Sequence, residues 1–172
     1  MNINGKKAIV FGGTSGIGLS ATQMLSDKGA HVIALSRNPE RMENLPKNVV
    51  TKKMNVLDTD ALENFFQEEG EFDILVNSAT GGARAVGPFL SMDLDGYKAS
   101  FDKLWGYTNV VRYGAKHLKN NGNIVLVSGS PARKCRQGQI AISSVGGAVE
   151  AFARGIAPEI APKRINIVSP GV

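Results

Sequence analysis

Continuous apolar runs alternate with helix-like segments along this chain, and the alternation constrains the fold more than any other feature. Runs such as residues 7–11, 72–77 and 123–128 place apolar side chains at successive positions instead of at every second one. Strands with that pattern are buried on both faces, which is typical of a parallel sheet covered by helices on each side. The sequence therefore predicts an α/β fold with three layers, α/β/α.

The predicted elements follow one another in regular order. Six strands are expected at residues 7–11, 30–36, 49–55, 72–77, 123–128 and 164–168. The helices expected between them cover residues 17–28, 39–45, 58–69, 94–118 and 141–157. With 172 residues, 42% of them apolar, the chain has the size of a single domain with a full core. Ligands of such sheets bind beyond the carboxyl ends of the strands, so the chemistry is expected there.

The first strand runs directly into the sequence GGTSGIG, residues 12–18. Its glycines allow a tight turn, a close approach of the backbone to a phosphate and close packing of the next helix. The N-terminus of that helix offers free N–H groups and the positive end of its dipole to a pyrophosphate. A purely structural turn is the alternative, but the position between a strand and a helix favours nucleotide binding. The residues expected to bind the dinucleotide here are Gly12, Thr14, Ser15, Gly16, Ile17 and Gly18.

The end of the second strand indicates which dinucleotide is bound. An NAD site places a carboxylate there for the ribose hydroxyls, whereas this chain has Ser36 and Arg37. A carboxylate would repel a 2′-phosphate, and an arginine pairs with one through two parallel hydrogen bonds. Arg37 therefore favours NADP(H) over NAD(H), with a solvated surface arginine as the alternative.

Composition limits the other classes of partner. The net charge is +5, but the basic residues are scattered and no nucleic-acid motif is present, so a solvated basic surface is expected. One cysteine and two distant histidines predict no metal centre. Because no apolar run is long enough to span a bilayer and the N-terminus lacks a signal pattern, we expect a cytoplasmic protein with no membrane partner.

Three further motifs accompany the glycine turn. They are Asn55-Val56, NSAT at residues 77–80 and INIVSPG at residues 165–171. With them the chain resembles the short-chain dehydrogenase/reductase family over essentially its whole length. The resemblance implies one NAD(P)-binding domain over residues 1–172 with a Rossmann-type doubly wound parallel sheet. It adds to the expected cofactor-binding residues Asn55, Val56, Asn77, Ser78 and Ala79.

The family transfers a hydride between a nicotinamide and a carbonyl or alcohol carbon, using an Asn, a Ser, a Tyr and a Lys four residues after the Tyr. At the matching positions this chain has Lys103, Gly129, Ile142 and Gly146. Ile142 has no exchangeable proton, and Gly146 removes the cation that lowers the pKa of the Tyr. The resemblance therefore implies a member with no catalytic residue of the usual kind.

Gly146 and Gly147 lie side by side inside a predicted helix, where each costs about 1 kcal/mol relative to Ala. If the matching position normally holds a Lys, then Gly146 leaves space of about that size. A neighbouring backbone, the Lys103 side chain or a ligand are the three possible occupants.

Three functions stay open at this point. The first is an NADP(H)-binding protein that lacks catalysis and acts as a sensor, scaffold or regulatory partner. The second is an active oxidoreductase for a small carbonyl or alcohol substrate, with a proton relay rebuilt from among Lys103, Ser128, Ser130 and Lys134. The third is a structural subunit of an oligomer.

Two expectations concern the whole chain. The resemblance implies a homodimer or homotetramer formed through the two long helices. Family members usually continue beyond the sixth strand with a substrate-covering segment, so we expect a domain truncated after that strand.

Overall fold

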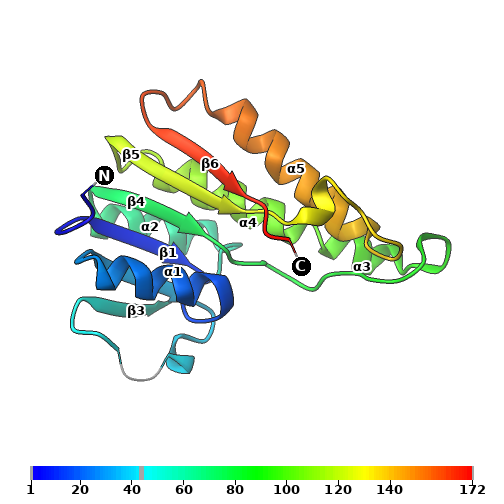
Figure 1. Cartoon of the computed structure of the whole chain (residues 1–172), viewed down its shortest axis with the longest axis horizontal. Helices are drawn as coiled ribbons and strands as arrows, with labels where there is room; N and C mark the ends of the chain where they lie inside the picture. Colours follow the sequence, from blue (N-terminus) through cyan, green and yellow to red (C-terminus); the bar gives the residue numbers. More distant parts are fainter. Residues whose placement is uncertain (1, 43–44, 172) are drawn as a thin grey trace.

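The computed structural model describes residues 2–42 and 45–171, and these form one six-stranded sheet (Figure 1). All neighbouring strands are parallel, in the order β3-β2-β1-β4-β5-β6. The order reverses between β1 and β4, so the doubly wound α/β fold predicted from the sequence is confirmed. The strands are β1 (Lys7–Phe11), β2 (His31–Ser36), β3 (Val49–Lys53), β4 (Phe72–Asn77), β5 (Leu118–Val127) and β6 (Arg164–Val168).

Helices cover both faces of the sheet. They are α1 (Gly16–Asp27), α2 (Thr59–Glu69), α3 (Leu94–Ala99), α4 (Asp102–Gly114) and α5 (Ile140–Ile156). In Figure 1, α1 lies in front of the sheet, while α2 and α4 lie behind it. Each face buries its own apolar cluster, so the three predicted layers are present. None of the helices in the described part of the chain is long and apolar enough to cross a membrane.

The carboxyl ends of β1, β2, β4 and β5 lie side by side, which brings the loops that follow these strands together. Phe11 of β1 is paired with Leu35 of β2 and with Asn77 of β4. Asn77 is paired in turn with Leu126 of β5. The glycine turn and the loops after β2, β4 and β5 therefore meet at the carboxyl end of the sheet, where the sequence predicts the site.

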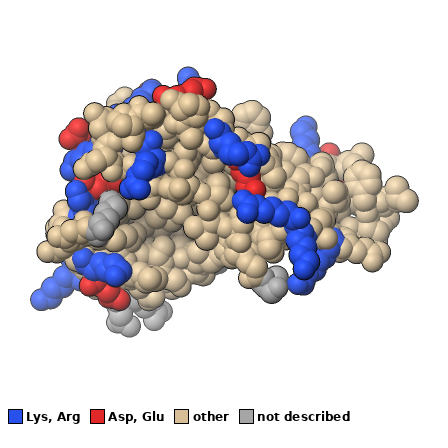
Figure 2. Space-filling view, turned by 45° about the horizontal axis from the view of Figure 1, so that its top comes forward, with Lys and Arg blue, Asp and Glu red and all other residues tan. Residues whose placement is uncertain are grey.

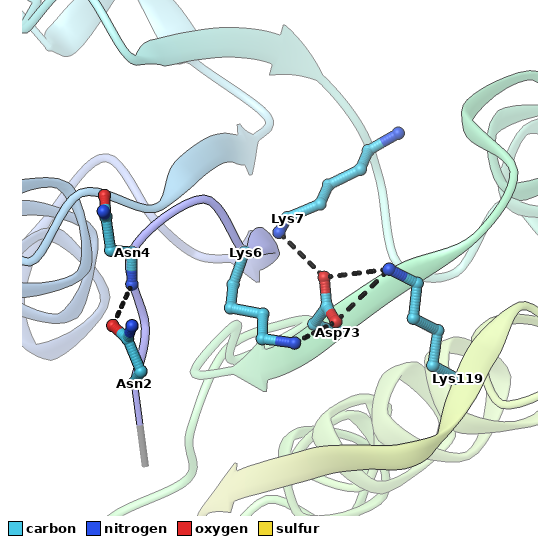
Figure 3. Close-up of polar contacts among 6 residues, drawn as sticks. All are labelled: Asn2, Asn4, Lys6, Lys7, Asp73 and Lys119. Carbon is cyan, nitrogen blue, oxygen red and sulfur yellow. Dashed lines mark hydrogen bonds and ion pairs between the residues drawn. The ribbon is translucent and has the colours of Figure 1, made fainter.

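At the opposite end of the sheet, where the strands begin, a buried carboxylate holds neighbouring strands together (Figure 3). Asp73 at the start of β4 accepts hydrogen bonds from the Lys7 backbone N–H at 3.0 Å and from the Lys6 Nζ at 3.1 Å, and it forms an ion pair with Lys119 at 3.3 Å. Burial alone would raise the pKa of Asp73, but these hydrogen bonds and the nearby ammonium charge lower it below its usual value. Asp73 thus ties the starts of β1, β4 and β5 together.

The long helix predicted over residues 94–118 is instead two helices, α3 and α4, followed by an early start of β5. Ser100 and Phe101 between them keep right-handed helical dihedral angles, so the apolar stripe runs on through the break. The Ser100 Oγ donates to the Gly96 carbonyl and accepts from the Ala85 N–H, each at 2.9 Å. β5 begins at Leu118, and its pairing with β4 shifts between Phe72 and Ile74.

The short helix predicted over residues 39–45 is a single 3-10 turn, Pro39–Arg41. Residues 43–44 of that prediction lie outside the described residues. The surface carries its Lys and Arg residues in several separate groups on the face shown in Figure 2.

Candidate cofactor-binding cleft

A cleft of about 440 Å³ lies at the carboxyl ends of β1, β2, β4 and β5. It is bounded by the glycine turn, the loops after β2, β3 and β4, and the first turn of α4. The residues predicted to bind the cofactor line this cleft, with the exception of Gly18 and Asn77. The structure therefore brings together side chains that are widely separated in the sequence.

The glycine turn has the backbone geometry that its glycines allow. Gly12 has φ of +73° and Gly16 has φ of +50°, values that other residues rarely adopt. A Cβ atom on Gly12 would lie 2.7 Å from the Ser78 Oγ, and one on Gly18 would overlap the Gly12 carbonyl. Gly18 thus packs α1 against the turn, below the cleft. The first turn of α1 faces the cleft, and its N–H groups have no acceptors within the helix.

The end of β2 reaches across the mouth of the cleft. The Thr14 Oγ1 donates to the Ser36 Oγ at 2.8 Å, which joins the glycine turn to β2. The next residue, Arg37, donates from its Nη1 to the Gly81 carbonyl at 3.3 Å. Arg37 therefore connects β2 to the loop after β4, and its guanidinium lies at the cleft.

The Asn55-Val56 pair forms the wall beside β3. The Asn55 Oδ1 accepts from the Leu57 N–H at 3.1 Å, which leaves the loop in a fixed turn. The Asn109 Nδ2 of α4 donates to the Val56 carbonyl at 3.1 Å. A helix behind the sheet thus positions this wall.

The NSAT segment continues β4 into the cleft. Asn77 is fully buried and its Oδ1 accepts from the Ala79 N–H at 3.0 Å. Its Nδ2 has no hydrogen-bond acceptor among the described residues. The Ser78 Oγ donates to the Phe11 carbonyl at 3.1 Å, so Ser78 joins the ends of β4 and β1. Asn77 shapes the turn from beneath, and Ser78 and Ala79 line the cleft itself.

Lys103 extends into the cleft from the first turn of α4. Its Nζ donates to the Ser128 carbonyl at 3.4 Å and lies 5.4 Å from the centre of the Tyr107 ring. Burial and the positive charge of Arg84 lower the pKa of Lys103 to about 8. Among the described residues, no carboxylate forms an ion pair with Lys103. The Tyr107 hydroxyl is buried and donates to the Val127 carbonyl at 2.8 Å.

The space beside Gly146 is filled by a neighbouring segment. A Cβ atom on Gly146 would lie 2.9 Å from the Ala132 Cβ and 3.2 Å from the Ser128 Oγ. Ala132 belongs to the 3-10 turn η3, Ser130–Ala132, which packs closely on α5. Of the three occupants considered from the sequence, the neighbouring segment is the one in contact, through the Ala132 and Ser128 side chains and the Ala132 Cα at 3.5 Å. A Cβ atom on Gly147, by contrast, would have no atom from another segment of the described chain within 4 Å.

The other sequence candidates divide between the cleft and its surroundings. Ser128 lines the cleft, and its Oγ donates to the Gly146 carbonyl at 3.1 Å. Ser130, Lys134, Gly129 and Ile142 are not among the residues that line it. No group of three or more metal-binding side chains is found where the structure is described.

Several residues that line the cleft were not identified by the sequence analysis. Two of them, Gly81 and Arg84, come from the loop after β4, because no motif rule covers the residues that follow NSAT. Arg84 is the charged member of the group and has the clearest chemical consequence. The residues of this group are Leu35, Asn38, Met54, Thr80, Gly81 and Arg84.

Comparison with known proteins places the chain among dehydrogenases and reductases. A family model described as short chain dehydrogenase matches residues 6–172. The 2,3-dihydro-2,3-dihydroxybenzoate dehydrogenase of Bacillus subtilis is 30% identical over 185 residues, covering 98% of this chain and 70% of the relative. The L-xylulose reductase of Mesocricetus auratus is 28% identical over 181 residues, covering 100% and 73%.

A solved structure shows the same arrangement of elements. The short chain dehydrogenase of Burkholderia cenocepacia J2315, crystallised in complex with NADP, matches with a TM-score of 0.90 and 26% identity. The match covers 99% of this chain and 74% of that chain.

Proposed function

The chain belongs to the short chain dehydrogenase family, and from that membership we propose that it binds NADP(H) in the cleft at the carboxyl ends of its strands. The cleft suits a dinucleotide because its glycine turn leaves room for a phosphate at the start of α1. A solved relative of this fold binds NADP, which supports the same class of cofactor here. The nicotinamide of a bound cofactor would supply or accept the hydride.

Preference for the phosphorylated cofactor rests on Arg37. Its guanidinium lies at the cleft beside Ser36, where a 2′-phosphate would be recognised. The described residues that line the cleft include three cations and no Asp or Glu, so none of them repels a phosphate. We therefore propose NADP(H) over NAD(H).

We further propose that this member does not use the family's usual proton relay. The observation that carries the proposal is the packing at Gly146, where Ala132 and Ser128 fill the place from which a Lys side chain would extend. Ile142 offers no proton at the position expected for the Tyr. The favoured role is that of an NADP(H)-binding sensor, scaffold or regulatory subunit.

One observation favours a second candidate function, a working oxidoreductase with a rebuilt relay. Lys103 lines the cleft with its pKa lowered to about 8, close to the value that suits an acid or base near neutral pH. In that case its ammonium would give a proton to a carbonyl oxygen as the carbon receives the hydride.

We also propose self-association through α4 and α5, the long helices behind the sheet. Trp105 on α4 supports this because 60% of its surface is exposed, although it is a large apolar side chain.

A pair of measurements tests the proposed function. NADPH and NADH are titrated into the purified protein by calorimetry, and the NADPH-bound protein is then assayed against a broad panel of carbonyl and alcohol substrates. We expect NADPH to bind more tightly than NADH, with no turnover on the panel.

The outcomes separate the candidates. Failure of both nucleotides to bind would overturn the cofactor proposal. Turnover that is lost in Lys103→Met but kept in Lys134→Met would replace the non-catalytic proposal with the rebuilt relay. Lys134 is a suitable control because it is exposed and does not line the cleft.

A further inference from the structure

Two of the three cations in the cleft lining lie outside the part of it that suits the phosphates of a dinucleotide. Arg37 and the N-terminus of α1 lie on the β1–β2 side, where the 2′-phosphate and the pyrophosphate of NADP(H) would be held. Lys103 lies at the β5 end of the cleft, against the Ser128 carbonyl, and Arg84 comes from the loop after β4. The nicotinamide and its ribose, which remain for that part of the cleft, carry no negative charge. The cofactor thus leaves two cations without an anion.

The protein does not neutralise these two cations either. Asp102 is the neighbour of Lys103 in α4, but its carboxylate lies beside Gly82 and does not line the cleft. Among the described residues, neither Lys103 nor Arg84 forms an ion pair with a carboxylate. The contacts of the Lys103 Nζ are the Ser128 carbonyl and the face of the Tyr107 ring, both uncharged.

Without a ligand, these two unpaired cations destabilise the folded protein. Lys103 is half-buried, and removing an ammonium from water without an opposite charge opposes folding. Arg84 adds repulsion, since its charge helps to lower the pKa of the Lys103 amine. A negatively charged ligand between the two side chains would relieve both effects.

We propose that Lys103 and Arg84 form a subsite for a small organic anion, a carboxylate or a phosphate ester, beside the nicotinamide end of the cleft. The subsite rests on the proposed binding of NADP(H) and names the class of second ligand for it. Arg84 supplies a planar fork that matches the oxygens of a carboxylate or phosphate, and Lys103 supplies a point charge. The Ser128 carbonyl orients the ammonium at the end of β5.

Calorimetric titration into the NADP⁺-saturated protein tests the subsite. The probes are malonate, inorganic phosphate and malonamide, which resembles malonate but has no charge. We expect malonate or phosphate to bind and malonamide not to bind, and the stronger of the two anions distinguishes a carboxylate from a phosphate ligand. Lys103→Met and Arg84→Met should each weaken anion binding about tenfold, the effect of one lost charged hydrogen bond.

Two controls keep the result specific. Lys134→Met removes an exposed cation outside the cleft lining and should leave anion binding unchanged. Lys103→Arg keeps the charge and should retain most of the affinity, which also guards against a Lys103→Met variant that fails to fold. Anion binding to the wild type should weaken as the pH rises past about 8, because Lys103 loses its proton there.

The possible results separate this subsite from the proposed function. If NADP⁺ binds while neither anion does, or if malonamide binds as well as malonate, the subsite is overturned and the cofactor proposal stands. Equal anion affinity in Lys103→Met and the wild type would also overturn it. If NADP⁺ itself does not bind, the proposed function fails, and the same titration of the free protein decides the subsite by the same criteria.

Discussion

At the scale of single residues, the cleft contains groups whose position could be predicted from sequence and groups whose position could not. Gly12, Gly16 and Arg37 were predictable, because a strand, a glycine turn and a helix in succession fix where a phosphate fits. Arg84 was not, since it comes from a loop whose path depends on contacts made elsewhere. Gly146 was recognisable as unusual, but only the position of Ala132 tells what fills the space beside it.

Replacing Arg37 tests the choice of cofactor. Arg37→Ala should weaken NADPH binding about tenfold or more, because a charge-assisted hydrogen bond to the 2′-phosphate is lost. NADH lacks that phosphate, so its affinity should change much less. Competitive calorimetric titrations give both constants, with Lys53→Ala as a control for an exposed cation that lies outside the cleft lining. An equal loss for the two nucleotides would contradict the assignment.

Replacing each of the two adjacent glycines of α5 with alanine should have opposite effects on stability. Gly146→Ala should lower the free energy of unfolding by about 1–3 kcal/mol, since the new Cβ must displace Ala132 or Ser128. Gly147→Ala should raise it by about 1 kcal/mol, because its Cβ meets no other segment of the described chain within 4 Å and the helix gains propensity. Urea unfolding of the two variants measures the difference. A stabilised Gly146→Ala variant would show that η3 does not pack tightly on α5.

At the scale of elements, the apolar pattern predicted the strands well and the helix boundaries less well. β1 and β4 have the predicted limits, because burial on both faces marks a strand clearly. β6 also has its predicted limits, although its residues alternate between exposed and half-buried. The single helix predicted over residues 94–118 is wrong in its middle, where α3 and α4 are separate helices, and at its end, where β5 already begins. Ser100 and Phe101 keep helical backbone angles, so the periodicity does not register the break. The early start of β5 depends on pairing with β4, which is a property of the folded sheet.

Glu150 connects three elements and gives a pH-dependent prediction. In α5, it accepts hydrogen bonds from Ser169, which follows β6, at 2.8 Å and from Arg133, which follows η3, at 3.0 Å. Burial alone would raise the pKa of Glu150, but these hydrogen bonds and the charge of Arg133 lower it below the ordinary 4.5. The carboxylate therefore stabilises the fold above its unfolded-state pKa, and this contribution disappears as the pH falls through the lowered value.

Glu150→Gln should accordingly lower the free energy of unfolding by about 1 kcal/mol at neutral pH and have little effect in strong acid. Thermal unfolding at a series of pH values measures the difference between variant and wild type. Glu63→Gln removes an exposed carboxylate of α2 and should change stability little. A difference between Glu150→Gln and the wild type that does not shrink as the pH falls would contradict the proposed linkage.

At the scale of the whole molecule, two features of the fold favour contact with another chain. α4 and α5 lie together behind the sheet, and Trp105 stands exposed on α4. Within the described residues, β6 forms one edge of the sheet and pairs only with β5. An open edge and an exposed aromatic side chain both favour contact with another chain, and the proposed self-association uses the second of these.

Trp105 provides the test of that association. We expect the protein to elute as a dimer or tetramer in size-exclusion chromatography with light scattering. Trp105→Glu should weaken the association at least about tenfold, because a charge would replace a large apolar contact. Met24→Glu, which places a charge on the exposed face of α1, should leave the oligomer intact. A monomeric wild type at all concentrations would refute the proposal.

The contact between Gly146 and Ala132 also makes two parts of the chain interdependent. Any side chain at position 146 first meets η3, because its Cβ would lie 2.9 Å from the Ala132 Cβ. A larger residue there would therefore require the turn to move away from α5 at the same time. The packing of one small turn on one helix thus couples what position 146 can hold to the conformation of an earlier segment of the chain.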